Sequence, residues 1–243
     1  MNVYIWTSGE LKNDYIGEYI PWTPDASRTL LYLPLENNTN DYSGNSRTCT
    51  PTSVTFTTVG WVKSAHVWTT GGIIVTPTNF ITTSTKYKTV SVLVYWASSQ
   101  TSARRNIWEW AIQNAIFIWL CAYENSTKIN FFSWNTVWNQ PNTYMNDIAN
   151  KWSLITETVG DGVQKFYINW ELKQTNTYSS ALPAWWNRTN SYEQSQTIFN
   201  ARNWVSASEW LNWNAREIIF ENVLWSDEDV ANYYNRIKAK LWF

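Results

Sequence analysis

Glycine is the residue that this sequence lacks most, since only 8 of its 243 residues are glycine. Average usage predicts about 17 in a chain of this length, and a β-protein with many turns needs at least as many. Tryptophan is in excess by a similar amount, with 19 residues. Most turns of this chain must therefore form without glycine.

Cysteine and histidine are also scarce, because Cys49, Cys121 and His66 are the only residues of these two types. A single disulfide is open to the two cysteines, but a buried free thiol that packs as a small apolar group is the commoner arrangement. Three such residues at this spacing do not make a zinc site. No nucleophile-elbow sequence surrounds His66, so we expect a hydrogen-bonded strand histidine rather than part of a hydrolase triad.

Charge is low as well: 15% of the residues are charged and the net charge is -1. Without a basic patch, neither nucleic acid nor an anionic membrane is expected as an electrostatic partner. No run of about 18 apolar residues occurs, so no membrane insertion is predicted. Residues 1–6 lack the basic and apolar parts of a secretory signal, which suggests another export route or attachment to a larger particle.

Short apolar runs separated by turn-forming residues fill most of the sequence. Residues 90–96 and 165–169 alternate with the period of a β-strand. We predict strands at residues 29–35, 53–58, 64–67, 72–76, 88–96, 106–111, 115–123, 128–134, 152–159, 164–169, 171–174, 197–200 and 215–225. Many short strands without an internal repeat predict an all-β fold, with a jelly-roll β-sandwich as the leading architecture.

The two ends of the chain differ from this middle part. Residues 1–25 are polar and aromatic and end in Pro21 and Pro24, so we interpret them as an N-terminal arm or linker before a single domain at residues 26–243. Near the other end, Ser226 and Asp229 resemble a helix capping box, and apolar residues follow at three- and four-residue spacing. One short C-terminal helix is therefore predicted.

Several segments form a recognisable order: the opening at residues 32–35 and 40–45, the segments at residues 60–67 and 71–75, the strands at residues 89–96 and 152–156, the hairpin at residues 160–169, and the closing strand and capped helix at residues 217–229. Together they resemble the concanavalin A-like lectin/glucanase domains of the laminin-G-like (LamG) group. The resemblance extends from residue 28 to residue 243. It implies a concanavalin A-like jelly-roll β-sandwich with one short C-terminal helix.

For function, the resemblance implies a non-catalytic recognition module. The expected ligand is a carbohydrate on a cell surface or a phage particle, and the expected partner is a glycan or a surface protein within a larger assembly such as a phage tail. The protein would then be extracellular, at the cell surface or associated with a virion. A structural or protein–protein interaction module without sugar binding is the alternative, and a degenerate glycoside hydrolase is a third.

The acidic residues give catalysis little support. Glucanases of this fold place two carboxylates on one face of a strand in an E-x-D-x-x-E pattern, because retaining hydrolysis needs them about 5 Å apart. This chain has no such pattern. Glu217 and Glu221 do lie four residues apart on a predicted strand, but the matching segment of the family is structural. We interpret them as solvated or edge carboxylates and do not expect an enzyme.

The predicted binding residues lie in loops that hold aromatic side chains beside amides and an arginine. Aromatic rings stack on the C–H faces of sugars, while polar side chains bond the hydroxyl groups. The candidate ligand-binding residues are Trp138, Asn139, Trp185, Trp186, Arg188 and Tyr192. Each has a plainer interpretation as a residue packed within its own loop.

A structural calcium ion is the one cofactor that the resemblance suggests, since related domains often carry one. Asp41 and Asn45 lie in a turn-rich loop whose side-chain and backbone oxygens suit Ca²⁺. The alternative is that Asp41 accepts hydrogen bonds from its own turn. Both interpretations are open at the level of sequence.

Tryptophan stands where the family pattern has glycine at Trp61, Trp68, Trp170, Trp213 and Trp242. The turn Asn169-Trp170 shows the difficulty, because two-residue hairpins favour positive φ, at which a bulky residue is a steric outlier. Either the turn is relaxed and the indole is displayed for a partner, or some of these tryptophans are glycine codons read under another genetic code.

Overall fold

The computed structural model describes residues 3–7, 10–14, 23–76, 87–96, 105–109, 119–122, 129–132, 148–177, 196–198 and 213–241. Most of these residues lie in antiparallel strands, and a helix follows the last strand. The all-β prediction with one short C-terminal helix is confirmed for this part of the chain.

Twelve of the strands form one sheet. They are β3 (Thr29–Leu33), β4 (Thr48–Val59), β5 (Val62–Thr76), β6 (Lys88–Trp96), β7 (Arg105–Glu109), β8 (Trp119–Ala122), β9 (Ile129–Phe132), β10 (Trp152–Gly160), β11 (Val163–Ile168), β12 (Glu171–Thr177), β13 (Gln196–Ile198) and β14 (Trp213–Glu221). The order along the sheet is β12-β11-β10-β6-β14-β5-β13-β7-β8-β9, with β3 beside β14 and β4 beside β5.

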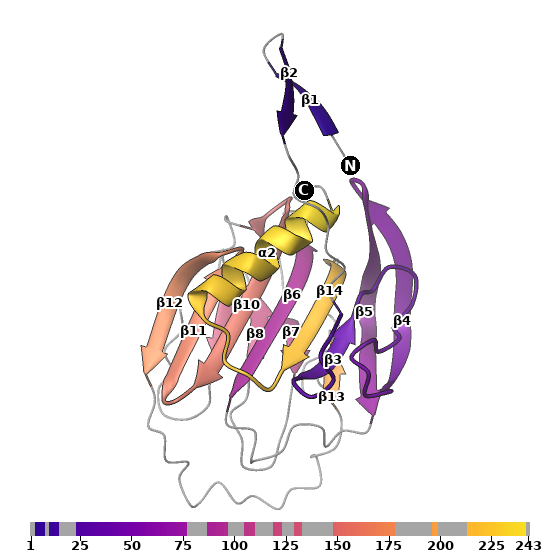
Figure 1. Cartoon of the computed structure of the whole chain (residues 1–243). Helices are drawn as coiled ribbons and strands as arrows, with labels where there is room; N and C mark the ends of the chain where they lie inside the picture. Colours follow the sequence, from indigo (N-terminus) through magenta and orange to yellow (C-terminus); the bar gives the residue numbers. More distant parts are fainter. Residues whose placement is uncertain are drawn as a thin grey trace, which may run out of the picture.

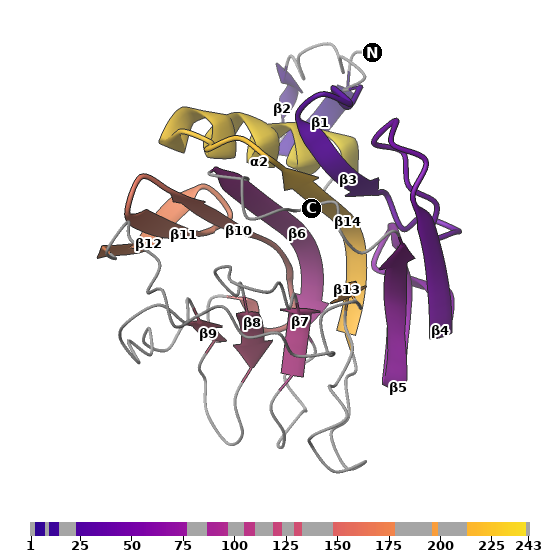
Figure 2. The ribbon, with the colours of Figure 1, turned by 90° about the horizontal axis from the view of Figure 1, so that it is seen from below.

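The long strand β5 belongs to both layers of the sandwich. Its first part pairs with β14, where Val67 lies opposite Trp213, and its last part pairs with β13, where Ile73 lies opposite Ile198. The sheet therefore folds over itself, and β7, β8 and β9 form a second layer behind β10 and β6 (Figures 1 and 2). Two separate strands were predicted here; that prediction is wrong, because β5 is continuous over 15 residues.

The helix α2 (Asp227–Leu241) covers the face of the sheet that we call the outer face (Figure 2). Its buried residues Val230 and Ile237 belong to the same apolar cluster as Leu154 of β10. The opposite side, the inner face, carries a second cluster that includes Ile155, the next residue of β10. Successive strand residues thus alternate between the two clusters, as the period of a β-strand requires.

The helix begins with the predicted capping box. The amide N–H of Asp229 donates to Ser226 Oγ (3.1 Å), and the amide N–H of Ser226 donates to Asp229 Oδ2 (2.8 Å). The preceding strand is shorter than predicted, since β14 ends at Glu221 rather than at Trp225. Within the described ranges, no helix has the length and apolar composition needed to cross a membrane.

Two-residue turns join β10 to β11 and β11 to β12. In the first, both Asp161 and Gly162 have positive φ (48° and 76°), the pattern of a type I′ turn. In the second, positive φ falls on Asn169 (60°) and not on Trp170. The expected steric conflict at Trp170 is therefore wrong, because asparagine, which tolerates the left-handed region, takes that position.

The N-terminal residues form a hairpin that the sequence analysis missed. The strands β1 (Val3–Thr7) and β2 (Glu10–Asp14) pair with each other in a sheet of their own, apart from the large sheet (Figure 1). The β-branched and aromatic residues of β1, Val-Tyr-Ile-Trp-Thr, are the signal that could have revealed it. The division into an arm at residues 1–25 and a domain at residues 26–243 stays a prediction.

Cys49 lies in β4 with a free, half-buried thiol. Burial raises the pKa of this thiol to about 12, so it stays protonated at neutral pH. Cys49 therefore follows the commoner of the two expected arrangements, in which the thiol packs as a small apolar group.

Candidate functional site

Glu217 of β14 is a buried carboxylate with three partners on α2. Tyr233 Oη and Arg236 Nη2 both donate to its Oε1 at 2.9 Å, and Lys240 Nζ donates to its Oε2 at 3.1 Å. Burial opposes ionisation, but the positive charges of Arg236 and Lys240 outweigh it and hold the pKa of Glu217 below its usual value. The carboxylate therefore fixes α2 against the sheet.

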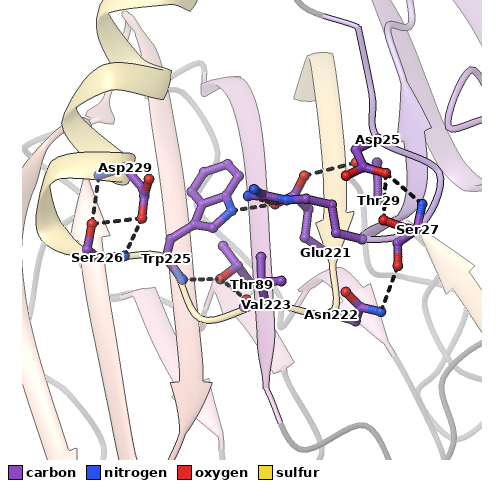
Figure 3. Close-up of polar contacts among 11 residues, drawn as sticks. Asp25, Ser27, Thr29, Thr89, Glu221, Asn222, Val223, Trp225, Ser226 and Asp229 are labelled. Atoms are coloured by element: carbon purple, nitrogen blue, oxygen red, sulfur yellow. Dashed lines mark hydrogen bonds and ion pairs between the residues drawn. The ribbon is translucent and has the colours of Figure 1, made fainter.

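Glu221, also on β14, ties the start of the sandwich to the connection between strand and helix (Figure 3). Thr29 Oγ1 donates to its Oε1 (2.9 Å), while Arg28 Nη2 (2.7 Å) and Trp225 Nε1 (2.6 Å) donate to its Oε2. The amide N–H of Trp225 in turn donates to Thr89 Oγ1 of β6 (3.1 Å). The Glu221 side chain is only 2% exposed, so these bonds take the place of solvent.

These contacts correct the interpretation of Glu217 and Glu221 as solvated or edge carboxylates. Both side chains are buried on the outer face, beneath α2 and the connection that leads into it. Each of their carboxylate oxygens accepts a hydrogen bond from the protein itself. These bonds hold β14 to α2 and to the start of the sandwich.

His66 of β5 is a hydrogen-bonded strand histidine, as expected. Its Nδ1 lies 3.3 Å from Asn214 Oδ1, and Asn214 Nδ2 donates to Ser64 Oγ (3.0 Å) and Thr57 Oγ1 (2.8 Å). The imidazole is buried. This network joins β4, β5 and β14, so the histidine contributes to the pairing of these strands.

Glu157 of β10 is a buried carboxylate that the sequence analysis missed. It shares the alternation of Ile155 and Val159 and so lies on the inner face. Gln164 of β11 donates to its Oε1, whereas its Oε2 has no hydrogen-bond partner among the described residues. Gln164 in turn accepts a bond from Asn176 of β12 (3.2 Å). A line of polar side chains thus runs from β12 to a carboxylate in the interior.

The environment of Glu157 favours its neutral form. Burial raises the pKa of the carboxyl to about 8, and the hydrogen bond from Gln164 offsets only part of this effect. The side chain is 4% exposed, so water does little to stabilise the ionised form. A raised pKa in an interior marks many functional sites but also some structural groups. Lys88 of β6 alternates with Val90 and Val92 on the same inner face, and burial lowers its pKa to about 8.

Asp41 closes its own turn. Its Oδ1 accepts from the amide N–H groups of Tyr32 (3.1 Å) and Ser43 (2.9 Å), and its Oδ2 accepts from Ser43 Oγ (2.8 Å) and the amide N–H of Arg47 (3.1 Å). Asn45 Nδ2 donates to a backbone carbonyl (2.7 Å). The arrangement fits the turn interpretation, and calcium binding at Asp41 and Asn45 stays an untested prediction.

In the part of the chain that the structure describes, no group of three or more His, Cys, Asp or Glu side chains comes together. This finding does not test a calcium site formed by backbone carbonyls and a single acidic residue, because Ca²⁺ binds both carbonyl and carboxylate oxygens.

Two exposed indoles stand at hairpin turns. In the β4–β5 turn, Gly60 has positive φ (62°) and precedes Trp61, just as Asn169 precedes Trp170 in the β11–β12 turn. Trp61 and Trp170 are 93% and 56% exposed. Because neither indole is buried in the core, both are available to a ligand.

Trp152 of β10 connects these two turns. Its Nε1 donates to the carbonyl of Val59, beside the β4–β5 turn (3.2 Å). Two residues along β10, the amide N–H of Leu154 donates to Asn169 Oδ1 (3.0 Å), and the amide N–H of Asn169 donates back to the Leu154 carbonyl (2.6 Å). The two exposed indoles therefore lie at the same end of the sandwich, the upper end in Figure 1.

The predicted ligand-binding residues lie outside the described residues and stay a prediction. They are Trp138, Asn139, Trp185, Trp186, Arg188 and Tyr192. Sequence reasoning placed Trp170 in a hairpin turn and named Trp61 only as a position where the family pattern has glycine, and it did not bring the two turns to one end of the fold. The link through Trp152 joins residues far apart in the chain, and no local pattern announces it.

No family model matches the chain, and no curated protein matches its sequence. Solved structures do resemble it. Domain 4 of a GH43 extracellular arabinanase from Geobacillus stearothermophilus, in complex with arabinotriose, has a TM-score of 0.62 at 15% identity, over 84% of this chain and 97% of that domain.

Two further structures share the fold. The botulinum neurotoxin serotype D binding domain has a TM-score of 0.62 at 18% identity, over 86% of this chain and 52% of that one. A mutant of Trypanosoma rangeli sialidase with trans-sialidase activity has a TM-score of 0.63 at 10% identity, over 88% of this chain and 34% of that one. The chain thus spans about half of the neurotoxin domain, and these likenesses confirm a β-sandwich.

Proposed function

We propose that this protein is a non-catalytic recognition module that binds carbohydrate. The observation that carries the proposal is the likeness to domain 4 of the arabinanase, which extends over 97% of that domain, solved with arabinotriose. At 15% identity, the support comes from the shared fold and not from matched residues. The site must therefore be argued from the side chains of this chain.

The end of the sandwich with the two exposed indoles supplies suitable chemistry. Trp61 and Trp170 present apolar rings on which sugar C–H groups can stack. The exposed side chains of Lys63 and Glu171 lie close to these turns in the sequence, and exposed Lys151 directly precedes Trp152; they offer donors and acceptors for hydroxyl groups.

The finer part of the proposal concerns family and location. The sequence resemblance supports a LamG-type module that reads glycans on a cell surface or a phage particle, outside the cell and attached to a larger assembly. The arabinanase with the similar domain is extracellular, which agrees with that location. The rival is a structural module that binds protein and no sugar.

A glycan array that includes arabinan oligosaccharides tests the proposal. We expect binding in the micromolar range, typical of single lectin-like sites, and its loss in the Trp61→Ala, Trp170→Ala double variant. Leu224→Ala is the matched control, because Leu224 is also an exposed apolar side chain (41%) but belongs to the connection before α2. Binding to no glycan on the array would favour the structural module, and release of reducing sugar would indicate an enzyme.

A further inference from the structure

Trp152 of β10 fixes the position of the turn that carries Trp61. Its indole is 8% exposed and packs on Tyr95 of β6, with the ring centroids 5.7 Å apart. In the sheet, β6 and β14 separate β10 from β5 by about 14 Å at the usual strand spacing. The carbonyl of Val59 is nevertheless 3.2 Å from Trp152 Nε1. The β4–β5 turn therefore bends toward β10 across the outer face, where Val59, Val62 and Trp152 pack in one apolar cluster.

The same strand fixes the turn that carries Trp170. Leu154 exchanges two hydrogen bonds with Asn169: its carbonyl accepts from the amide N–H of Asn169 (2.6 Å), and its amide N–H donates to Asn169 Oδ1 (3.0 Å). Leu154 lies two residues after Trp152, so about 7 Å of strand separates the two anchoring residues. Trp170 follows Asn169 directly. Both exposed indoles thus extend from turns that are bonded to the first residues of one strand.

The two indoles are separate platforms at this end of the fold. Trp61 is 93% exposed and Trp170 is 56% exposed, so neither ring covers the other. One sugar unit stacks on the face of one ring, and it therefore contacts one indole at a time. Exposed Lys63 and Glu171 follow the two turns and offer a hydrogen-bonding group near each ring. Two similar platforms on one rigid support favour a ligand that repeats the same unit.

We propose that this end of the sandwich binds a linear oligosaccharide at two points, one unit on Trp61 and another on Trp170, with Trp152 as the positioning residue that sets the spacing. This two-point contact rests on the proposed function and specifies its ligand as a chain of several units rather than a single sugar. Binding of one unit holds another at a high effective concentration over the second ring, so affinity increases without any new kind of contact. A monosaccharide gains nothing from the second indole.

Isothermal titration calorimetry on the whole chain tests the two-point contact. The ligands are a size ladder of linear arabinan oligosaccharides, from arabinose to arabino-octaose, and the same ladder of every other glycan that binds on the array. We expect weak binding of the shortest members and a rise in affinity of at least about tenfold once the chain reaches both rings. Trp61→Ala and Trp170→Ala should each remove this rise, so that long members bind like short ones. Leu224→Ala is the control and should keep it, since Leu224 lies beside Gly160, at the other end of β10 from Trp152.

Trp152→Phe separates a positioning role from a merely structural one. Phenylalanine keeps an aromatic ring beside Tyr95 but removes the N–H that bonds the Val59 carbonyl. This variant should bind short members like the parent protein and lose most of the rise for long ones, with thermal unfolding showing that it is folded. A full rise in Trp152→Phe would overturn the positioning role.

The ladder also separates this proposal from the proposed function. If affinity does not depend on chain length and only one indole is needed, the two-point contact is wrong and the proposed function stands. If no member of any ladder binds, the proposed function fails and the two-point contact fails with it.

Discussion

The two faces of the central strands shift the pKa of a buried carboxyl group in opposite directions. On the outer face, Glu217 accepts bonds from Arg236 and Lys240, and Glu221 accepts them from Arg28. On the inner face, the described part of the chain gives Glu157 one amide donor and leaves its Oε2 without a partner. The pKa of Glu217 is lowered and that of Glu157 is raised. Burial alone raises a carboxyl pKa, so a nearby cation decides the direction.

The difference follows from what packs against each face. Lys240 and Arg236 lie near the end of α2, where positive side chains also favour the helix dipole, and they reach down to Glu217. Among the described residues, the polar line that leads to Glu157 consists of the amides of Gln164, Asn176 and Gln174. Amides can hold a neutral carboxyl as well as an ionised one, whereas cations hold only the ionised form.

Glu217→Gln should have the largest effect on stability. It leaves Arg236 and Lys240 without their counter-charge in a largely buried site, which costs about 4 kcal/mol of unfolding free energy. Urea unfolding at pH 7 measures this. Glu228→Gln, on an exposed residue of the first turn of α2, is the control and should cost less than about 1 kcal/mol.

The pH dependence of the same variant sharpens the comparison. The folded-state pKa of Glu217 lies below its unfolded value, so its contribution is fully present above the unfolded pKa and is lost as pH falls through the folded one. The gap in stability between the parent protein and Glu217→Gln should therefore narrow in acid. A gap that stays constant down to acid pH would contradict the assigned ion pairs.

Glu157→Gln should show the opposite pH dependence. The folded-state pKa of about 8 lies above the ordinary value of 4.5, so the folded protein keeps a proton that the unfolded chain releases between these values. The parent protein then loses stability as pH rises, by about 3 kcal/mol in all between pH 5 and 8. Glutamine keeps the shape without the charge, so the variant should become the more stable protein at pH 8. Parallel stability curves would show that Glu157 ionises without penalty.

Glu221→Gln should have a smaller effect, about 2 kcal/mol, because a neutral amide weakens the bonds from Arg28 and Trp225. The Arg28 side chain is 45% exposed and can regain water, which limits the loss. Thermal unfolding should show this decrease, with Asp25→Asn, at an exposed residue, as the control. A loss of unfolding free energy as large as that of Glu217→Gln would mean that water reaches the Glu221 site less than the exposure of Arg28 indicates.

Trp170→Gly should have the smallest effect, less than about 1 kcal/mol, since the indole is 56% exposed and Asn169 carries the positive φ. Urea unfolding measures it, and a larger loss would show that the indole packs against one of the two faces.

The intact mass of the native protein, with the codons of its gene, tests the related prediction that some tryptophans, such as Trp61 and Trp170, are recoded glycine.

Features with a local pattern were predicted well. The alternation of β6 (Lys88–Trp96) predicted both of its ends, and Ser226 with Asp229 predicted the start of α2. Strand β5 was predicted as two pieces, because nothing local shows that one strand passes through both layers. The stretch around Glu157, Thr-Glu-Thr, is polar on both faces, so its burial depends on a second layer that local pattern does not reveal.

The carboxylates of β14 show the same limit for the site. Their positions on one face of a strand followed from the sequence, but their environment did not. Arg236 is 19 residues from Glu217, and Arg28 is 193 residues from Glu221. Since an isolated carboxylate on a strand is usually solvated, the prediction of exposure was reasonable and wrong.

Local spacing of residues accounts for the strands, the capped helix and the low charge of this protein, because each depends on neighbours in the chain. Pairing between residues far apart in the chain accounts for the remaining properties. It places the turns of Trp61 and Trp170 at one end of the sandwich, gives Glu217 its cations, and gives Glu157 an amide partner within the described part of the chain. These properties depend on which strand lies beside which, and the packing of two layers and a helix sets that order.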